Sequence, residues 1–542
     1  MDSFKLLKRR TTDLLSSIPQ NLPSIQSLNL GQHGHHGHHT KSLTMKGTYE
    51  KISIPPMARS SHSANVVAGN VYIFGGESAS ARKPVDNDMH VVALPASSAP
   101  ADYYTVKAKA AEKSKPAPPA DAAGGETAAA AGIPAPTANM VGDVPAPRVG
   151  HATATIGRRI FLFGGRGGPD MTPLDEGGRV WVFDTRIHLW SYLDPVVPAG
   201  ASRDTPAVPA PRSYHAAVAT DKPNEFNLAP RHPKPVTRAD TWKEWALGDS
   251  DEVGIPQRPI VGNVAARATD ADEDGFGTFV IHGGCLADGL RAADVWAFDV
   301  HSRTWQRLPD APGAPRGGAA LALSRSRLYR YGGFNGAAEE GGQLDVLELA
   351  VDRFDDEFSA GEVAVTARGG WQSLLQGREN VGYKEIDPAE APLTQGEREA
   401  EAWPGPRSVA RLEVVTVGGG REYLVLLLGE REPPTPGTGH EVAGKFWDDI
   451  WAFQVPAQGG TTASLTDSVL SAVGRKSGEG RWARVELGAH DDEDDASLDG
   501  PGARGWFASA PVGDLDESAV VIWGGLDGEN KRLSDGWIIR LS

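Results

Sequence analysis

The sequence predicts an all-β fold of six repeated small sheets, and two recurring patterns carry this prediction. The first is a run of four bulky residues followed by two glycines. Four bulky residues suit a short strand buried on both faces, and two glycines let the backbone turn with positive φ where strands crowd. The run occurs five times, with a sixth, degenerate copy last in this series: Val71–Gly76, Ile160–Gly165, Phe279–Gly284, Leu328–Gly333, Val520–Gly525 and Leu424–Gly429.

The second pattern consists of single residues at recurring places around each run. An arginine stands upstream of every copy, usually after a proline: Arg59, Arg148, Arg212, Arg316, Arg407 and Arg504. A histidine follows this arginine at the same spacing in three units: His62, His151 and His215. A second strand with an acidic residue comes downstream, and a tryptophan closes most units: Trp190, Trp305, Trp371 and Trp482. Together these features define a repeat.

The order of these features resembles the kelch repeat over most of the chain. Each unit would supply about four short strands, a sheet too small to cover its own faces. Such sheets become stable by packing radially around a channel. The resemblance therefore implies an all-β, six-bladed kelch β-propeller.

The two ends of the chain are predicted to meet in one blade. The last unit ends at Trp537–Ser542 without a closing strand of its own. Thr48–Ile52 precedes the first arginine and has the pattern of the missing outer strand. Pairing the two would close the ring and leave few free edges.

The expected organisation is a histidine-containing disordered tail at 1–46 and a propeller at 47–542. Gly31–Thr40 holds five histidines in seven positions, but glycine spacing fixes no metal geometry. Four inserts interrupt the propeller: a disordered one rich in Ala and Pro, and three long loops. Their ranges are 107–147, 221–277, 376–402 and 456–480. Trp242 and Trp245 in the second insert either anchor a partner or pack locally.

Composition limits the possible partners. The chain has 54 Lys and Arg against 70 Asp and Glu, a net charge of −16, and no basic cluster interleaved with aromatics, so nucleic acid is not an expected partner. No apolar run is long enough to span a membrane, and the basic N-terminus lacks the apolar core of a secretory signal. The single Cys285 excludes an intramolecular disulfide and favours a reducing compartment. We expect a cytoplasmic monomer.

The six arginines are the first candidate site. If each precedes the innermost strand of its blade, all six reach the same end of the channel and form a ring of guanidinium groups. Such groups bind carboxylate, sulfate or phosphate oxygens. The competing interpretation is structural, because arginines at this place in kelch repeats often bond to neighbouring carbonyls and acids.

The loop after the degenerate run is the second candidate. Its order of Gly-Glu, prolines, His and Ala-Gly-Lys-Phe resembles a loop of plant nitrile-specifier and epithiospecifier kelch proteins, which implies an Fe(II) site of the form Glu-x3-Asp-x3-His. Glu432 and His440 stand where the outer ligands would, but Pro436 occupies the middle position and offers no side-chain oxygen. Glu430, Glu441 or Asp448 would have to substitute. Galactose oxidase, also a kelch propeller, needs a cysteine linked to a tyrosine, and Cys285 alone does not indicate one.

The function expected from the sequence is a non-catalytic scaffold or adaptor that binds a protein partner through loops at the channel mouths. No catalytic residue and no required cofactor are assigned. The alternative is a small-molecule-binding or enzyme-like propeller of the nitrile-specifier type, possibly dependent on Fe(II). A pocket on which Arg148, Arg212, Glu432 and His440 converge would favour the alternative, and a mouth filled by loops would favour the scaffold.

Overall fold

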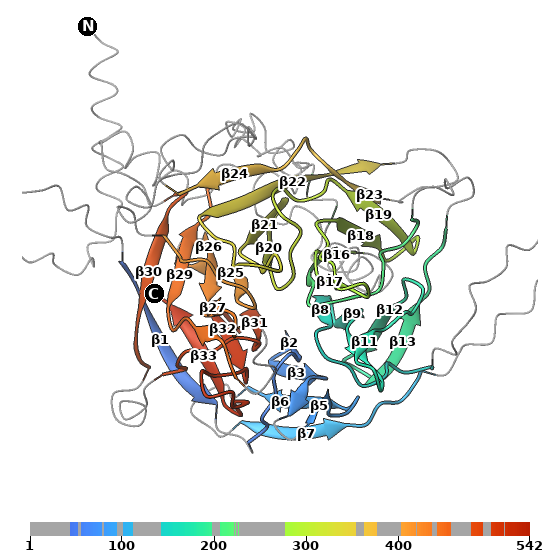
Figure 1. Ribbon diagram of the computed structural model, residues 1–542, viewed down its shortest axis with the longest axis horizontal. Helices are drawn as coiled ribbons and strands as arrows, with labels where there is room; N and C mark the ends of the chain where they lie inside the picture. The colour runs from blue at the N-terminus through green and yellow to red at the C-terminus, as the bar shows by residue number, and fades with distance from the viewer. Residues whose placement is uncertain are drawn as a thin grey trace, which may run out of the picture. The chain divides into compact units, whose positions relative to one another are not determined.

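The computed structural model divides the chain into two units, 1–41 and 42–542, and only the second contains described residues. Figure 1 shows its strands. The described residues contain no α-helix. Their ranges are 44–52, 56–78, 81–94, 101–111, 142–197, 206–221, 223, 226, 277–353, 363–376, 403–418, 420–435, 442–456, 479–490, 500–513 and 515–542.

The main strands form antiparallel sheets in which each bulky run is the second strand. The first three sheets, from the innermost strand outward, are β2 (Ser63–Val67), β3 (Asn70–Phe74), β6 (Met89–Ala93) and β7 (Asp102–Val106); β8 (Ala152–Ile156), β9 (Arg159–Phe163), β12 (Val180–Asp184) and β13 (Leu189–Leu193); and β15 (Ala216–Thr220), β16 (Thr278–His282), β18 (Val295–Asp299) and β19 (Thr304–Leu308).

The next three sheets repeat this order. They are β20 (Ala320–Ser324), β21 (Arg327–Tyr331) and β22 (Gln343–Arg353), which pairs with both β23 (Val363–Ala367) and β24 (Gln372–Leu375); β25 (Arg411–Val417), β26 (Arg421–Leu427), β29 (Ile450–Gln454) and β30 (Trp482–Ala489); and β31 (Ala508–Gly513), β32 (Asp516–Trp523), β33 (Gly536–Leu541) and β1 (Thr44–Ile52).

The innermost strands make a closed circuit. β2 contacts β8, β8 contacts β15, β15 contacts β20, β20 contacts β25, β25 contacts β31, and β31 contacts β2. Figure 1 shows the sheets side by side around this circuit. The predicted all-β propeller is therefore confirmed, and its innermost strands line a channel.

The N-terminal strand joins the last sheet as predicted. β1 pairs antiparallel with β33, with Tyr49 opposite Ile539. It begins at Thr44, inside the range expected to be tail, and it also pairs in parallel with β30, which the sequence did not suggest. β1 thus joins two neighbouring sheets and covers an edge of each.

Apolar clusters lie between neighbouring sheets rather than inside them. One cluster joins Tyr72 and Phe74 of the first sheet to Trp181 and Trp190 of the second, and five others join the remaining neighbours. The closing tryptophan explains part of this packing. The Trp190 ring lies 5.1 Å from the Phe74 ring of the preceding sheet. The tryptophan that closes this sheet therefore packs against its neighbour.

Short two-stranded sheets, three of them hairpins, stand at one mouth of the channel. They begin directly after a diglycine, or after its degenerate equivalent, and pair with a second short strand. They are β4 (Glu77–Ser78) with β5 (Ala81–Pro84), β10 (Arg166–Gly167) with β11 (Thr172–Pro173), β17 (Cys285–Leu286) with β14 (Arg212–Ser213), and β27 (Glu430–Glu432) with β28 (Lys445–Phe446). Among the described residues, no helix has the length and apolar character needed to cross a membrane.

Candidate functional site: the mouth pocket

The six predicted arginines are buried and bonded within the sheets. Each donates a hydrogen bond to a carbonyl at the first position of its own diglycine: Gly75, Gly164, Gly283, Gly332, Leu428 and Gly524. Each also pairs with a carboxylate, in the order Arg59–Asp86, Arg148–Glu176, Arg212–Asp294, Arg316–Glu340, Arg407–Asp449 and Arg504–Asp535, at 2.6 to 3.8 Å. The hydrogen bonds of these arginines therefore hold the loops at this mouth in place. Their ligand-binding role stays a prediction.

The repeated histidines are buried next to these arginines. His62 and His215 have pKa values lowered to about 3, mainly by burial and then by Arg59 and Arg212 respectively, so both rings are neutral at pH 7. The position of the His215 ring accounts for the first glycine of the diglycine in the preceding sheet. A Cβ on Gly164 would lie 2.8 Å from the His215 ring, and the φ of Gly164 is +63°, so this position requires glycine.

A closed circle of backbone hydrogen bonds forms below the hairpins. Each bond joins the second residue after one repeat arginine to the equivalent residue of the neighbouring sheet. The amides donate in the order Ser61 to Trp506, Trp506 to Val409, Val409 to Gly318, Gly318 to Tyr214, Tyr214 to Gly150 and Gly150 to Ser61, at 2.6 to 3.3 Å. All six residues have positive φ, from +43° at Val409 to +64° at Gly318. The circle therefore holds the sheets together at this mouth.

A pocket of about 430 Å³ lies at this circle. The residue directly after each diglycine lines it, one from every sheet: Glu77, Arg166, Cys285, Phe334, Glu430 and Leu526. Five circle residues also line it: Ser61, Tyr214, Gly318, Val409 and Trp506. The same repeat position thus carries a carboxyl group in two sheets, and a guanidinium group, a thiol, an aromatic ring or an aliphatic chain in the others. The backbone is repeated from sheet to sheet, but the side chains at this position differ in chemistry.

Two arginines in the pocket lack acidic partners among the described residues. Arg166 donates from Nη2 to the Tyr214 hydroxyl at 2.7 Å and stacks on its ring, whereas Arg291 donates to the Gly289 carbonyl at 2.9 Å. Within the described ranges neither forms an ion pair, and the buried Nε of each has no hydrogen-bond partner. Both lower the pKa of the Cys285 thiol against the larger effect of burial, so both positive charges act near that side chain. This part of the pocket is suited to an anion.

The third pocket arginine is neutralised. Arg532 is buried and pairs with Glu77 through Nη2 and Oε1 at 2.8 Å. Aromatic side chains also line the pocket. The Tyr214 and Trp506 rings meet edge to face at 5.0 Å. Phe334 lies under the Arg291 guanidinium at 5.4 Å. The pocket therefore combines positive charge with apolar surface.

Two carboxyl groups of the fourth and fifth sheets hold their protons unusually well, and one of them, Glu430, lines the pocket. Burial raises the pKa of Glu430 to about 7. Burial, followed by the charges of Glu430 and Glu340, raises the pKa of Glu339 to about 8, although the Ser408 hydroxyl opposes the rise. Neither buried oxygen of Glu339 has a well-oriented hydrogen-bond partner among the described residues. At neutral pH these groups repel an anion far less than two ordinary carboxylates would.

The predicted metal ligands lie apart from this pocket as far as the structure describes them. Glu432 is exposed and accepts a hydrogen bond from Lys445 at 2.6 Å across hairpin β27–β28. His440 and Pro436 lie outside the described residues, as do the histidine-rich tail, Trp242 and Trp245. No cluster of three or more His, Cys, Asp or Glu suited to a metal occurs in the described ranges. The Fe(II) site stays a prediction.

The four residues proposed as the mark of a small-molecule site do not meet in the mouth pocket. Arg148 and Arg212 are buried in separate sheets, Glu432 points to Lys445, and none of the three lines the pocket. The mouth nevertheless holds an open pocket lined by other residues. Sequence reasoning missed them because it treated the position after the diglycine as part of a turn. The signal was present: that position differs in charge and size from repeat to repeat.

The sheets, repeat arginines and diglycine turns together form a β-propeller whose repeats follow the kelch pattern. A sequence model of the kelch motif matches residues 147–196, which form most of the second sheet. The matched segment contains both Arg148 and Arg166.

Three characterised proteins are similar to parts of the chain. N-(sulfonatooxy)prop-2-enimidothioate sulfolyase of Thlaspi arvense is 30% identical over 36% of this chain and 53% of its own length. The Rho GTPase-activating protein gacHH of Dictyostelium discoideum is 23% identical over 31% of this chain and 8% of its own. The dynein alpha chain of the flagellar outer arm of Chlamydomonas reinhardtii is 22% identical over 45% of this chain and 4% of its own. The chain thus spans about half of the first relative.

One solved structure, that of YjhT, aligns with a TM-score of 0.41 and 11% identity over 90% of this chain and 95% of its own.

Proposed function

We propose that this protein binds a small organic anion of the sulfate-ester or sulfonate class in the mouth pocket. The observation that carries the proposal is the presence of Arg166 and Arg291 in the pocket wall, each with unused donors and no acidic partner among the described residues. Every repeat arginine, in contrast, is paired with a carboxylate. Guanidinium donors match the spacing of sulfonate oxygens.

The rest of the pocket suits the organic part of such a ligand. Tyr214, Trp506 and Phe334 offer ring faces and edges, and Pro433 and Pro434 add apolar surface. A volume of about 430 Å³ falls in the range of small-molecule sites. The sulfolyase relative, by its name, acts on a compound that carries a sulfonatooxy group. That similarity supports the ligand class, and we assign no reaction to this chain.

Calorimetric titration with phenyl sulfate tests the proposal, with anisole as a neutral ligand of similar shape. The wild type should bind phenyl sulfate and prefer it to anisole. Arg166→Met should weaken phenyl sulfate binding roughly tenfold or more, because a hydrogen bond to a charged group contributes about 1.5–3 kcal/mol. Arg368→Met, which removes an exposed arginine paired with Glu348, is the matched control and should bind like the wild type. The proposal would be overturned if the wild type bound phenyl sulfate and anisole equally well. It would also be overturned if Arg166→Met and Arg368→Met bound phenyl sulfate equally well.

The scaffold role expected from the sequence stays a prediction, and the same variant distinguishes it. A protein that docks on peripheral loops does not need the guanidinium of Arg166 inside the pocket. Capture of a partner protein that is unchanged by Arg166→Met, together with a failure of phenyl sulfate to bind, would favour the scaffold.

A further inference from the structure

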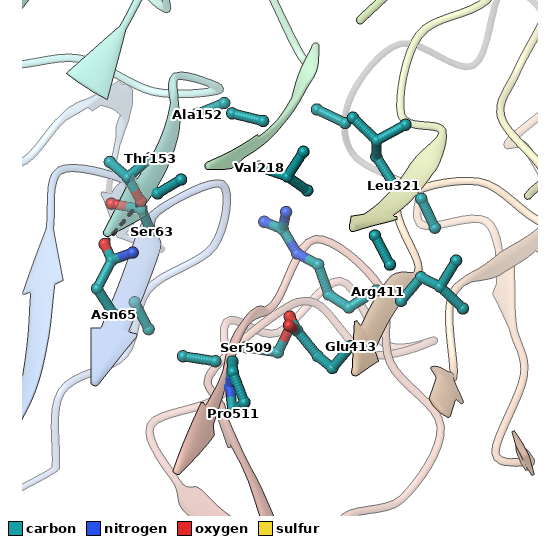
Figure 2. Close-up of a pocket in the computed structure, with 18 of the residues that line it drawn as sticks. Ser63, Asn65, Ala152, Thr153, Val218, Leu321, Arg411, Glu413, Ser509 and Pro511 are labelled. Atoms are coloured by element: carbon teal, nitrogen blue, oxygen red, sulfur yellow. Dashed lines mark hydrogen bonds between the residues drawn. The ribbon is translucent and has the colours of Figure 1, made fainter. Parts of the chain in front are cut away.

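The channel contains a second cavity, of about 220 Å³, whose lining shares no residue with the mouth pocket. Figure 2 shows this cavity between the innermost strands. Alanine, valine and leucine side chains make up most of its wall. Arg411 and Glu413, both on β25, bring opposite charges into it. His151 also lines it, but burial and the charge of Arg148 lower its pKa well below 6.5, so the ring is neutral at pH 7.

The two charges of β25 do not pair with each other. Arg411 donates from Nε to the Phe507 carbonyl at 3.1 Å, and Glu413 accepts a hydrogen bond from the Ser509 hydroxyl at 2.5 Å. No carboxylate oxygen of the described residues lies within 4.0 Å of the Arg411 nitrogens. In Figure 2 the guanidinium end of Arg411 projects into the cavity, whereas Glu413 turns toward Ser509.

Partial burial of Arg411 makes its isolated guanidinium group costly. It lowers the pKa of Arg411, which the nearby charge of Glu413 offsets in part. A desolvated charge destabilises the fold unless its donors are bonded and its charge is balanced. The six repeat arginines meet both conditions with a carboxylate each, whereas Arg411 has one bonded nitrogen and no carboxylate within ion-pair distance in the described part of the chain.

A second donor is available on the strand β2. The Oδ1 atom of Asn65 accepts a hydrogen bond from the Thr153 hydroxyl at 2.7 Å, which leaves its amide group as the remaining polar end of the side chain. Asn65 lines the same cavity, and Figure 2 shows its amide nitrogen on the side that faces the cavity. A guanidinium and an amide donor that line one cavity are the partners that a small anion needs.

We propose that the channel binds a small inorganic anion, between chloride and sulfate in size, on the terminal amino groups of Arg411. Asn65 on β2 supplies a further donor. Glu413 sets the strength of binding, because its negative charge lies two residues along the same strand and opposes the anion. The site stabilises the channel and is independent of the organic ligand at the mouth.

Thermal unfolding at constant ionic strength tests the site, with chloride or sulfate replacing the bulky gluconate ion. The unfolding temperature of the wild type should rise with chloride or sulfate, because an anion that binds only the folded state stabilises it. The rise should set in near the concentration that half-saturates the site and then continue with the logarithm of the concentration. Arg411→Met should lose this dependence. Arg368→Met, which lies outside both cavities, should keep it, and Arg411→Met should still bind phenyl sulfate at the mouth, so the two proposals fail separately.

Glu413→Gln provides a readout in the opposite direction. It keeps the hydrogen bond with Ser509 and removes the opposing charge, so the concentration of anion needed for half-saturation should fall roughly tenfold. This variant decides the matter if Arg411→Met does not fold. A wild-type response equal in gluconate and chloride, a response that survives Arg411→Met, or an unchanged half-saturation in Glu413→Gln would each overturn the proposal.

Discussion

At the scale of single residues, a comparison of Gly150 with Gly157 separates the cost of a left-handed backbone from the cost of a steric clash. Both have positive φ, +62° and +58°. A Cβ on Gly150 would lie 2.7 Å from the Tyr214 ring, whereas a Cβ on Gly157 would meet nothing within 4 Å. The first glycine lies in the circle of hydrogen bonds, and the second lies in an open turn.

We therefore expect different losses of stability from the same substitution. Gly157→Ala should lower the free energy of unfolding by about 1 kcal/mol, the cost of a left-handed residue with a Cβ. Gly150→Ala should cost about 1–3 kcal/mol more, because the methyl group displaces Tyr214. Urea unfolding of both variants gives the comparison. Equal losses would show that the sheets do not approach each other as closely as described.

The raised pKa values of Glu339 and Glu430 give a second prediction, for stability against pH. Each carboxyl has a usual value of 4.5, and in the folded protein it titrates at about 8 for Glu339 and about 7 for Glu430. Between pH 4.5 and 8 the folded state therefore binds more protons than the unfolded state. The contribution of these groups to stability is complete below pH 4.5 and is lost as pH rises through 7 and 8.

Glu339→Gln should flatten this decline, because the amide cannot ionise. Urea unfolding at several pH values between 5 and 9 measures it, with Glu529→Gln in an exposed loop as the control. A decline that is as steep in Glu339→Gln as in the control would contradict the assignment.

At the scale of elements, the strand β1 has the task of closing the ring. It fills the edge of β33 and also pairs with β30. Gly47 lies in the middle of this arrangement, and a Cβ there would meet the Arg540 carbonyl at 2.8 Å and the Leu487 side chain at 3.0 Å. Gly488 on β30 offers a contrast, since a Cβ there meets nothing within 4 Å.

Gly47→Val should therefore detach β1 at this point and lower the free energy of unfolding by about 1–3 kcal/mol. The exposed edge of β33 should then favour association between molecules. Unfolding curves and light scattering after gel filtration measure the two effects. Gly488→Val should change neither, and an equal effect of both variants would show that β1 does not close the ring.

The elements that the sequence predicted are those with a strong local pattern. The bulky run at Ile160–Gly165 became β9 with its turn, and Thr48–Ile52 became part of β1. The mouth hairpins were not predicted, because strands of two residues such as Arg166–Gly167 have no periodicity to detect. The parallel pairing of β1 with β30 was also missed, since it depends on how two neighbouring sheets approach.

At the scale of the whole molecule, the site arises from contacts between repeats, which explains why the sequence indicated it only in part. The repeat arginines stood out because they recur, yet recurrence here reflects their common bonds to carbonyls and carboxylates. Arg166 and Arg291 do not recur, and their isolation from acidic groups is visible only when all the sheets are in place. In a ring of repeats, a binding site is better sought at equivalent positions whose side chains differ from repeat to repeat.

The charges around the mouth predict how ligand binding depends on pH. As pH rises through 7 and 8, Glu430 and Glu339 lose their protons and place negative charge beside the anion. The affinity for phenyl sulfate should therefore fall across this range, whereas in Glu430→Gln the fall should be smaller. Titrations at pH 6 and pH 9 measure the difference. An affinity that is constant with pH in the wild type would contradict the placement of these carboxyls at the site.

The location of a bound ligand is the most direct test of the mouth pocket as an anion site. Crystals of the protein soaked with 4-bromophenyl sulfate allow the bromine to be placed by anomalous diffraction. The sulfate should lie against Arg166 and Arg291, with the bromophenyl ring beside Tyr214 and Trp506. A ligand found elsewhere, or an empty mouth at a concentration that saturates binding in solution, would contradict the account.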